Sequence, residues 1–112
     1  MILSVVIVSY NVQSFLKQCL NSIYQSDNID NFEIIVVDNY SFDNTVKMIK
    51  TEYPNVKLVE NDKNLGFAKA VNIGVKLSTA KNICLINPDS LIKKDTLDVM
   101  LNYLQNNDDV GV

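Results

Sequence analysis

The sequence contains no histidine among its 112 residues, and this absence limits the chemistry that the chain can perform. Neither a Ser-His-Asp nor a Cys-His catalytic arrangement can form without that side chain. Any acid-base or metal chemistry must therefore use carboxylates, tyrosine, lysine or neutral oxygen atoms.

Long apolar runs and clusters of basic residues are also absent. The apolar segment at residues 2–8 is too short to span a bilayer, and no basic residues precede it as they would in a signal peptide. The 10 basic and 13 acidic residues form no basic stripe, which argues against nucleic acid as a partner. These features predict a cytoplasmic protein.

The two cysteines fit neither a metal site nor a disulfide framework. Cys19 and Cys84 lie among apolar residues, and no histidine accompanies them. Free cysteine is often buried, so both are predicted to be small core residues. With 112 residues, of which 47% are hydrophobic, the chain is expected to form one domain over residues 1–112.

Short β-branched runs alternate along the chain with stripes of helical periodicity. Strands are predicted at residues 2–8, 32–37, 56–60 and 83–86, and helices at 12–24, 46–53, 67–75 and 95–105. This alternation predicts an α/β fold, a mostly parallel Rossmann-like sheet with helices on both faces.

Each predicted helix has an apolar face expected to point inward. The residues of these faces are Val12, Phe15, Leu16, Cys19, Leu20, Ile23 and Tyr24; Val46, Ile49 and Tyr53; Phe67, Ala70, Val71, Gly74 and Val75; and Leu97, Met100, Leu101 and Leu104. Gly74 in mid-helix costs about 1 kcal/mol relative to alanine, which either close packing on the sheet or chance would explain.

The last predicted strand, residues 83–86, is apolar throughout, which suits a strand covered on both faces. Pro88 cannot donate to a ladder, so the strand should stop there and leave Asp89 at its carboxyl end. Residues 108–112 resemble the beginning of another strand. The chain is therefore expected to be the amino-terminal part of a longer protein.

Three polar segments should meet at the carboxyl edge of the sheet, where ligands bind in open α/β folds: residues 9–11, 38–39 and 87–89. Asp, Asn and Ser are also common where a strand simply turns into a helix.

Glycine-rich phosphate-binding motifs are missing, which disfavours dinucleotide oxidoreductases and P-loop enzymes. Asp89 is instead well placed to hold a Mg²⁺ ion that bridges two phosphate oxygens. Asp38 could accept a hydrogen bond from a base, and Tyr10 could either stack on that base or be an ordinary rim residue.

Four motifs occur in order over nearly the whole chain: Ser4-Val-Val-Ile-Val-Ser-Tyr-Asn11; Val36-Val-Asp-Asn39 with Ser41-x-Asp43-x-Thr45; Asn64-Leu-Gly-Phe-Ala68 with Asn72-x-Gly74; and Leu85-Ile-Asn-Pro-Asp89. The ordered set resembles the family 2 glycosyltransferases, especially their rhamnosyltransferase-like members. The resemblance implies a GT-A fold, a nucleotide-sugar donor and transfer with inversion at the anomeric carbon.

The resemblance also implies roles for individual residues. Asp38 resembles the carboxylate that reads N3–H of uracil or thymine, and Asp89 the last aspartate of an Asp-x-Asp motif that binds Mg²⁺ or Mn²⁺. Asn87 stands where many relatives have an aspartate, so the metal could be bound more weakly. Asp43 is expected only to start a helix. The implied donor-binding residues are Ser9, Tyr10, Asn11, Asp38, Asn39, Gly66, Asn72 and Asn87, with Asp89 as the metal ligand.

The implied donor is a UDP- or dTDP-linked sugar, and the implied acceptor is a saccharide or a lipid-linked molecule, with peripheral membrane association of the full-length protein. The catalytic base is expected beyond Val112, so these residues alone should bind nucleotide without transferring sugar. Two alternatives stay open. One is a non-catalytic nucleotide- or partner-binding module of the same fold. The other is a phospho-receiver domain, which needs an acidic pair after the first strand and a lysine after a fifth.

Overall fold

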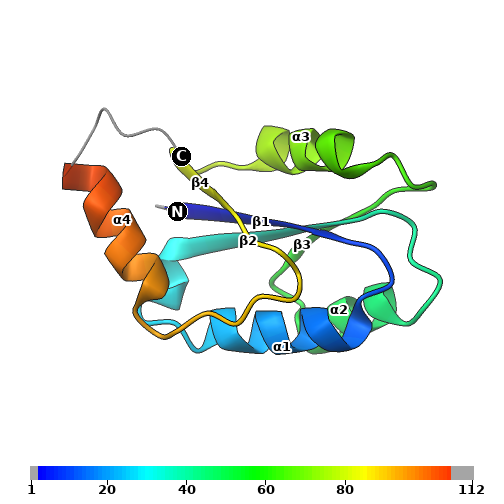
Figure 1. Ribbon diagram of the computed structural model, residues 1–112, viewed down its shortest axis with the longest axis horizontal. Helices are drawn as coiled ribbons and strands as arrows, with labels where there is room; N and C mark the ends of the chain where they lie inside the picture. The colour runs from blue at the N-terminus through cyan, green and yellow to red at the C-terminus, as the bar shows by residue number, and fades with distance from the viewer. Residues whose placement is uncertain (1–2, 107–112) are drawn as a thin grey trace.

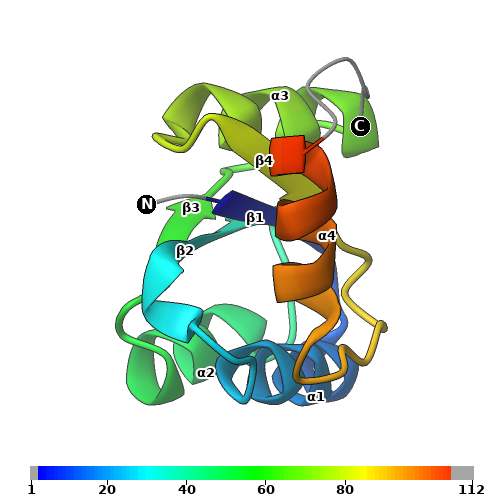
Figure 2. The same ribbon diagram turned by 90° about the vertical axis from the view of Figure 1, so that its left-hand side faces the viewer.

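The computed structural model describes residues 3–106, which form a four-stranded sheet with helices on both faces (Figures 1 and 2). All strand pairs are parallel, in the order β3-β2-β1-β4. The strands are β1 (Leu3–Ser9), β2 (Phe32–Asp38), β3 (Lys57–Glu60) and β4 (Asn82–Leu85). The predicted α/β fold with a parallel sheet is confirmed.

The helices cross between the strands on opposite sides of the sheet. Helix α3 covers one face, whereas α1 and α2 lie together on the other (Figures 1 and 2). Helix α4 lies on the side of the sheet that β4 forms. Their bounds are α1 (Gln13–Tyr24), α2 (Thr45–Glu52), α3 (Phe67–Leu77) and α4 (Thr96–Asn106), and a short 3-10 turn spans Ile29–Asn31. Within residues 3–106, no helix is long and apolar enough to cross a membrane.

Side chains of β1 alternate between two apolar clusters, one on each face of the sheet. Val5 and Ile7 join the larger cluster under α1, α2 and α4, and Val6 joins the smaller one under α3. Both cysteines are free and buried in or against the larger cluster, as predicted. The strands are therefore fixed in register by two separate packing surfaces.

Gly74 brings α3 close to the sheet. A Cβ atom at this position would lie 2.5 Å from Cγ1 of Val6 and 3.3 Å from Cγ2 of Val37. Both valines are buried and β-branched, so neither side chain can turn away easily. Of the two explanations for Gly74, the contacts support close packing on the sheet.

We expect Gly74→Ala to lower the free energy of unfolding by about 1–3 kcal/mol, because overpacking outweighs the better helix propensity of alanine. Urea denaturation followed by circular dichroism would measure the change. Lys76→Ala, an exposed position of the same helix, should change stability by less than about 0.5 kcal/mol. A variant G74A as stable as the wild type would contradict the close packing.

The prediction that residues 83–86 form a strand covered on both faces holds only in part, because Ile83 packs against the smaller cluster and Cys84 belongs to the larger one, but coverage stops at Leu85. β4 pairs with β1 and lies at the edge of the sheet that the described residues form, and Leu85 is 52% exposed. Ile86 follows the strand and packs against the larger cluster. A continuous apolar run cannot distinguish an edge strand from a central strand.

Some inward faces also differ from the prediction. Phe15 in α1 and Phe67 in α3 are 58% and 62% exposed, and Val75 is exposed as well. In α3 the sheet instead contacts Ala70, Ile73 and Gly74, because small residues allow the close approach that larger ones would prevent. Ile49 of α2 and Tyr53 directly after it are buried as predicted, but Thr45 and Met48 are buried where half-buried Val46 was expected. Leu97 and Leu101 of α4 are buried, whereas Leu104 is half-buried. The strand suggested by residues 108–112 lies outside the described residues.

Candidate functional site

The loops that follow β1 and β2 lie side by side at the carboxyl edge of the sheet (Figure 1). The Asn11 amide donates to Ser41 Oγ at 2.9 Å, and the Phe42 amide donates back to Asn11 Oδ1 at 2.7 Å. Asn11 and Tyr40 both adopt positive φ values, of 51° and 70°, which are uncommon for residues other than glycine. The hydrogen bonds between the loops therefore hold two unfavourable backbone conformations in place.

Asp38, the last residue of β2, connects these loops through its side chain. Ser9 Oγ and Ser41 Oγ donate to its Oδ1 at 2.7 and 2.6 Å, and the Ser41 amide donates to its Oδ2 at 2.9 Å. The aspartate is only 1% exposed, and Ser9 is fully buried. Direct contact between this carboxylate and a base stays a prediction, and it would require rearrangement of Ser41.

Asn39 points into a second set of contacts, which involves the loop before α3. Its Oδ1 accepts from Asn61 Nδ2 at 2.9 Å and from the Leu65 amide at 3.3 Å, while its Nδ2 donates to Gly66 O at 3.2 Å. Gly66 has a φ of 85°, which favours glycine. The structure thus brings Asn39 and Gly66 together. Asn72 lies on the exposed side of α3, and no hydrogen bond within residues 3–106 connects it with this loop.

Three aromatic rings are exposed on the same edge. Phe42 packs edge-on against Tyr10 at a centroid distance of 6.3 Å and against Tyr40 at 5.5 Å. Only Tyr10 was predicted as a site residue. Tyr40 and Phe42 flank Ser41, and their side chains gave no periodic signal.

Helix α2 begins at Thr45, and the Ser41 side chain donates to Asp38 and does not cap the helix. Asp43 does act near the helix start, accepting from the amides of Thr45 at 3.0 Å and Gln13 at 3.2 Å. Burial alone would raise the pKa of Asp43, but the hydrogen bond from the Thr45 hydroxyl, together with those from the two amides, outweighs burial and lowers it.

Asn87 and Asp89 lie on a tight turn after β4, in which the Ser90 amide donates to Asn87 O at 3.0 Å. Both side chains are exposed. The turn rests on α1, because the Cys19 thiol lies 3.8 Å from Asn87 O. Burial raises the pKa of Cys19 to about 11, and the negative charge of Asp89 contributes to the increase.

In the described part of the chain, no three His, Cys, Asp or Glu side chains form a cluster that could hold a metal ion. Asp89 nevertheless offers an accessible carboxylate, and Mg²⁺ is often held by one or two carboxylates with water and substrate phosphates. The residues present therefore fit a metal that a diphosphate helps to bind, not a closed protein site.

A second buried carboxylate lies near the amino-terminal ends of the strands, at the opposite end of the sheet from the candidate site. Glu33, 5% exposed, accepts from Ser4 Oγ at 2.7 Å, from the Thr79 amide at 2.9 Å and from Thr79 Oγ1 at 3.0 Å, and it also binds Lys57 Nζ. Burial alone would raise its pKa, but the bonds from Lys57, Thr79 and Ser4 lower it to about 2. Every oxygen has partners, so this cluster is structural.

The sequence pattern of glycosyl transferase family 2 matches residues 4–112. An uncharacterized glycosyltransferase of Haemophilus influenzae is 28% identical, over 97% of this chain and 34% of its own length. The SPbeta prophage-derived glycosyltransferase SunS of Bacillus subtilis is 36% identical, over 80% of this chain and 20% of its own length. The chain thus spans about a third or less of these two relatives.

Solved structures show the same arrangement. S. aureus TarS in complex with UDP-GlcNAc has a TM-score of 0.87 and 26% identity, over 95% of this chain and 32% of that one. The mannosyltransferase PcManGT from Pyrobaculum calidifontis, in complex with GDP-Man and Mn²⁺, has a TM-score of 0.83 and 28% identity, over 91% of this chain and 32% of that one. The predicted GT-A fold is confirmed by this likeness.

Proposed function

Because the chain belongs to glycosyl transferase family 2, we propose that it forms the donor-binding part of an inverting glycosyltransferase. One observation supports this most strongly. Loops after β1 and β2 are locked together at the carboxyl edge by Asp38, Asn11 and Ser41, and they present exposed aromatic rings beside that link. Transfer itself is proposed for the whole protein that contains these residues, with the base for the acceptor hydroxyl supplied from outside them.

In this proposal the nucleoside lies against Tyr10 at the rim and the diphosphate lies toward the turn after β4. Asp89 would hold Mg²⁺ or Mn²⁺, which when bound neutralises the charge that develops on the leaving diphosphate. Asn87 offers a neutral amide oxygen beside it. The loop fixed by Asn39 and Gly66 would form the opposite wall of the donor site.

The donor is proposed to be a UDP- or dTDP-linked sugar. TarS in complex with UDP-GlcNAc supports the uridine nucleotide, and PcManGT in complex with GDP-Man and Mn²⁺ makes GDP the comparison to include. A phospho-receiver function does not fit, because the loop after β1 carries Ser9, Tyr10 and Asn11 in place of an acidic pair.

Calorimetry with UDP, dTDP and GDP, each with and without Mn²⁺, tests the proposal. We expect metal-dependent binding of at least one nucleotide, and loss of the metal dependence in Asp89→Ala because the carboxylate ligand is removed. Asp30→Ala removes an exposed aspartate far from this edge and should bind like the wild type. Binding without any metal effect would favour the non-catalytic module, and no binding of any nucleotide would refute the donor site.

A further inference from the structure

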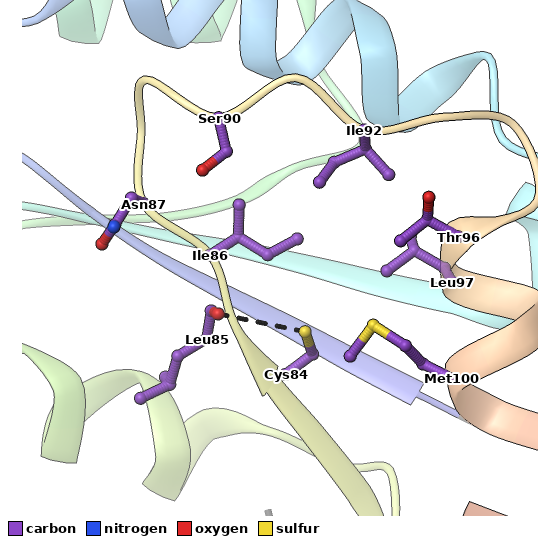
Figure 3. A pocket seen from close by; sticks show the side chains of 9 residues that line it. All are labelled: Cys84, Leu85, Ile86, Asn87, Ser90, Ile92, Thr96, Leu97 and Met100. Carbon is purple, nitrogen blue, oxygen red and sulfur yellow. Dashed lines mark hydrogen bonds between the residues drawn. The ribbon is translucent and has the colours of Figure 1, made fainter. Parts of the chain in front are cut away.

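A cavity of about 290 Å³ lies between α4 and the loop that follows β4 (Figure 3). Side chains from β4, from the loop and from α4 converge on it, whereas Leu85 directs its side chain away from it. The lining residues are Cys84, Leu85, Ile86, Asn87, Ser90, Ile92, Thr96, Leu97 and Met100.

The lining suits an uncharged, mostly apolar group. None of the lining residues carries a charge, and Ile86, Ile92, Leu97 and Met100 supply apolar walls. The volume is about twice the roughly 150 Å³ cavity that accommodates a benzene ring. Met100 is unbranched and can adapt its shape to different occupants.

The cavity adjoins the turn that carries the candidate metal ligand. Asn87 and Ser90 both line it, and Asp89 lies between them on the same tight turn. A group inside the cavity would therefore have its polar end within one turn of the proposed diphosphate. The diphosphate itself is excluded, because burial of its charges against apolar walls would be too costly.

We propose that this cavity binds the apolar part of the acceptor, an alkyl or aryl group next to the hydroxyl that receives the sugar. The inference rests on the proposed function, because it assigns the cavity to the second substrate of that reaction. Asn87 and Ser90 then lie where the acceptor changes from apolar to polar. The acceptor class would be amphipathic, not a free oligosaccharide.

Methyl-carbon NMR of methionine tests this assignment, because Met100 lines the cavity whereas Met48 is buried in α2 and serves as an internal control. Hexyl β-D-glucoside, kept below the concentration at which it forms micelles, should shift the Met100 methyl signal saturably and leave Met48 unchanged. Methyl β-D-glucoside has the same sugar without the chain and should shift neither signal. No saturable shift with hexyl glucoside, or equal shifts with both glucosides, would overturn the proposal.

A cavity-filling variant provides the second measurement. The Ser90 side chain points into the cavity (Figure 3), so Ser90→Phe should weaken hexyl glucoside binding at least tenfold. Thr51→Phe, at an exposed position of α2, should leave it unchanged. The Met48 signal reports whether each variant is folded. Unchanged hexyl glucoside binding in folded S90F would refute the cavity.

The nucleotide measurements separate this inference from the proposed function. Metal-dependent nucleotide binding without any response to hexyl glucoside would refute the cavity alone. A saturable Met100 shift caused by the nucleotide in the absence of glucoside would instead assign the cavity to the donor, and would also overturn the inference. Loss of nucleotide binding and of the glucoside response would refute both.

Discussion

Replacement of Glu33 by alanine should lower the free energy of unfolding by about 3 kcal/mol. The substitution leaves the hydroxyl of buried Ser4 without its acceptor, which costs about 1–3 kcal/mol, and it also removes the part-buried hydrogen bonds from the amide and hydroxyl of Thr79. Lys57 contributes less to the loss, because its side chain is 50% exposed and can return to water. Urea denaturation at neutral pH would measure the difference.

The same cluster predicts how stability depends on pH. A carboxyl pKa that falls from 4.5 to about 2 on folding corresponds to about 3 kcal/mol of stabilisation at neutral pH. Because the folded pKa is the lower one, this stabilisation is present above pH 4.5 and disappears as the pH falls toward 2. We expect Glu33→Gln to show a correspondingly smaller loss of stability between those values.

Glu52→Gln is the matched control for the Glu33 variants. Glu52 forms an ion pair with Lys17 at 3.1 Å, but both side chains are more than 40% exposed. The substitution should therefore change stability by less than about 1 kcal/mol. Equal acid sensitivity of wild type and Glu33→Gln would show that Glu33 does not titrate as the hydrogen bonds predict.

Periodicity predicted the succession of strands and helices along the chain and the parallel arrangement of the sheet, because alternating strands and amphipathic helices leave few compact solutions. It failed at Phe67 and Val75, where the contact face of α3 is set by the small residues Ala70 and Gly74. Phenylalanine is more hydrophobic than glycine, but the short distance between α3 and the sheet leaves room only for the smaller residue. It also failed at Leu85, since an apolar run does not reveal how many neighbours a strand has.

The edge on which the candidate site lies was predictable, but its internal connections were not. Parallel strands bring Ser9 and Asp38 into register, so their proximity follows from the strand order. The hydrogen bonds of Ser41 and Asn11 depend on two positive φ values that no local sequence rule required. The exposed position of Tyr40 and Phe42 depends on the same backbone.

Asp38 and Asn39 are adjacent but serve different loops. Asp38 binds Ser9 and Ser41 on the side of α1 and α2, and Asn39 binds Asn61, Leu65 and Gly66 at the start of α3. Successive side chains of a strand point to opposite faces, so one dipeptide at the end of β2 fixes loops on both sides of the sheet. We therefore expect Asp38 to support nucleotide binding indirectly, by holding the rim, the loops after β1 and β2, in place.

Ser41→Ala should weaken nucleotide binding about tenfold, and to a similar extent for UDP, dTDP and GDP. It removes the hydroxyl that accepts from Asn11 and donates to Asp38, so the loops that carry Tyr10 and Phe42 lose part of their connection. The charge of Asp38 stays in place. Ser78→Ala removes a serine hydroxyl at the far end of α3 and should bind each nucleotide like the wild type.

Asp38→Asn distinguishes positioning from direct reading of the base. If Asp38 accepts the N3–H of uracil or thymine, the substitution should weaken the binding of UDP and dTDP more than the binding of a nucleotide whose base makes no such bond. Ser41→Ala should then have little effect on the binding of any nucleotide. If Asp38 holds the rim, both substitutions should weaken all three nucleotides together. The buried carboxylate, with both of its oxygens already bonded to Ser9 or Ser41, leads us to expect the second result. Calorimetry on variants with matching thermal unfolding curves would decide between them, because a general loss of folding would then be excluded as the cause.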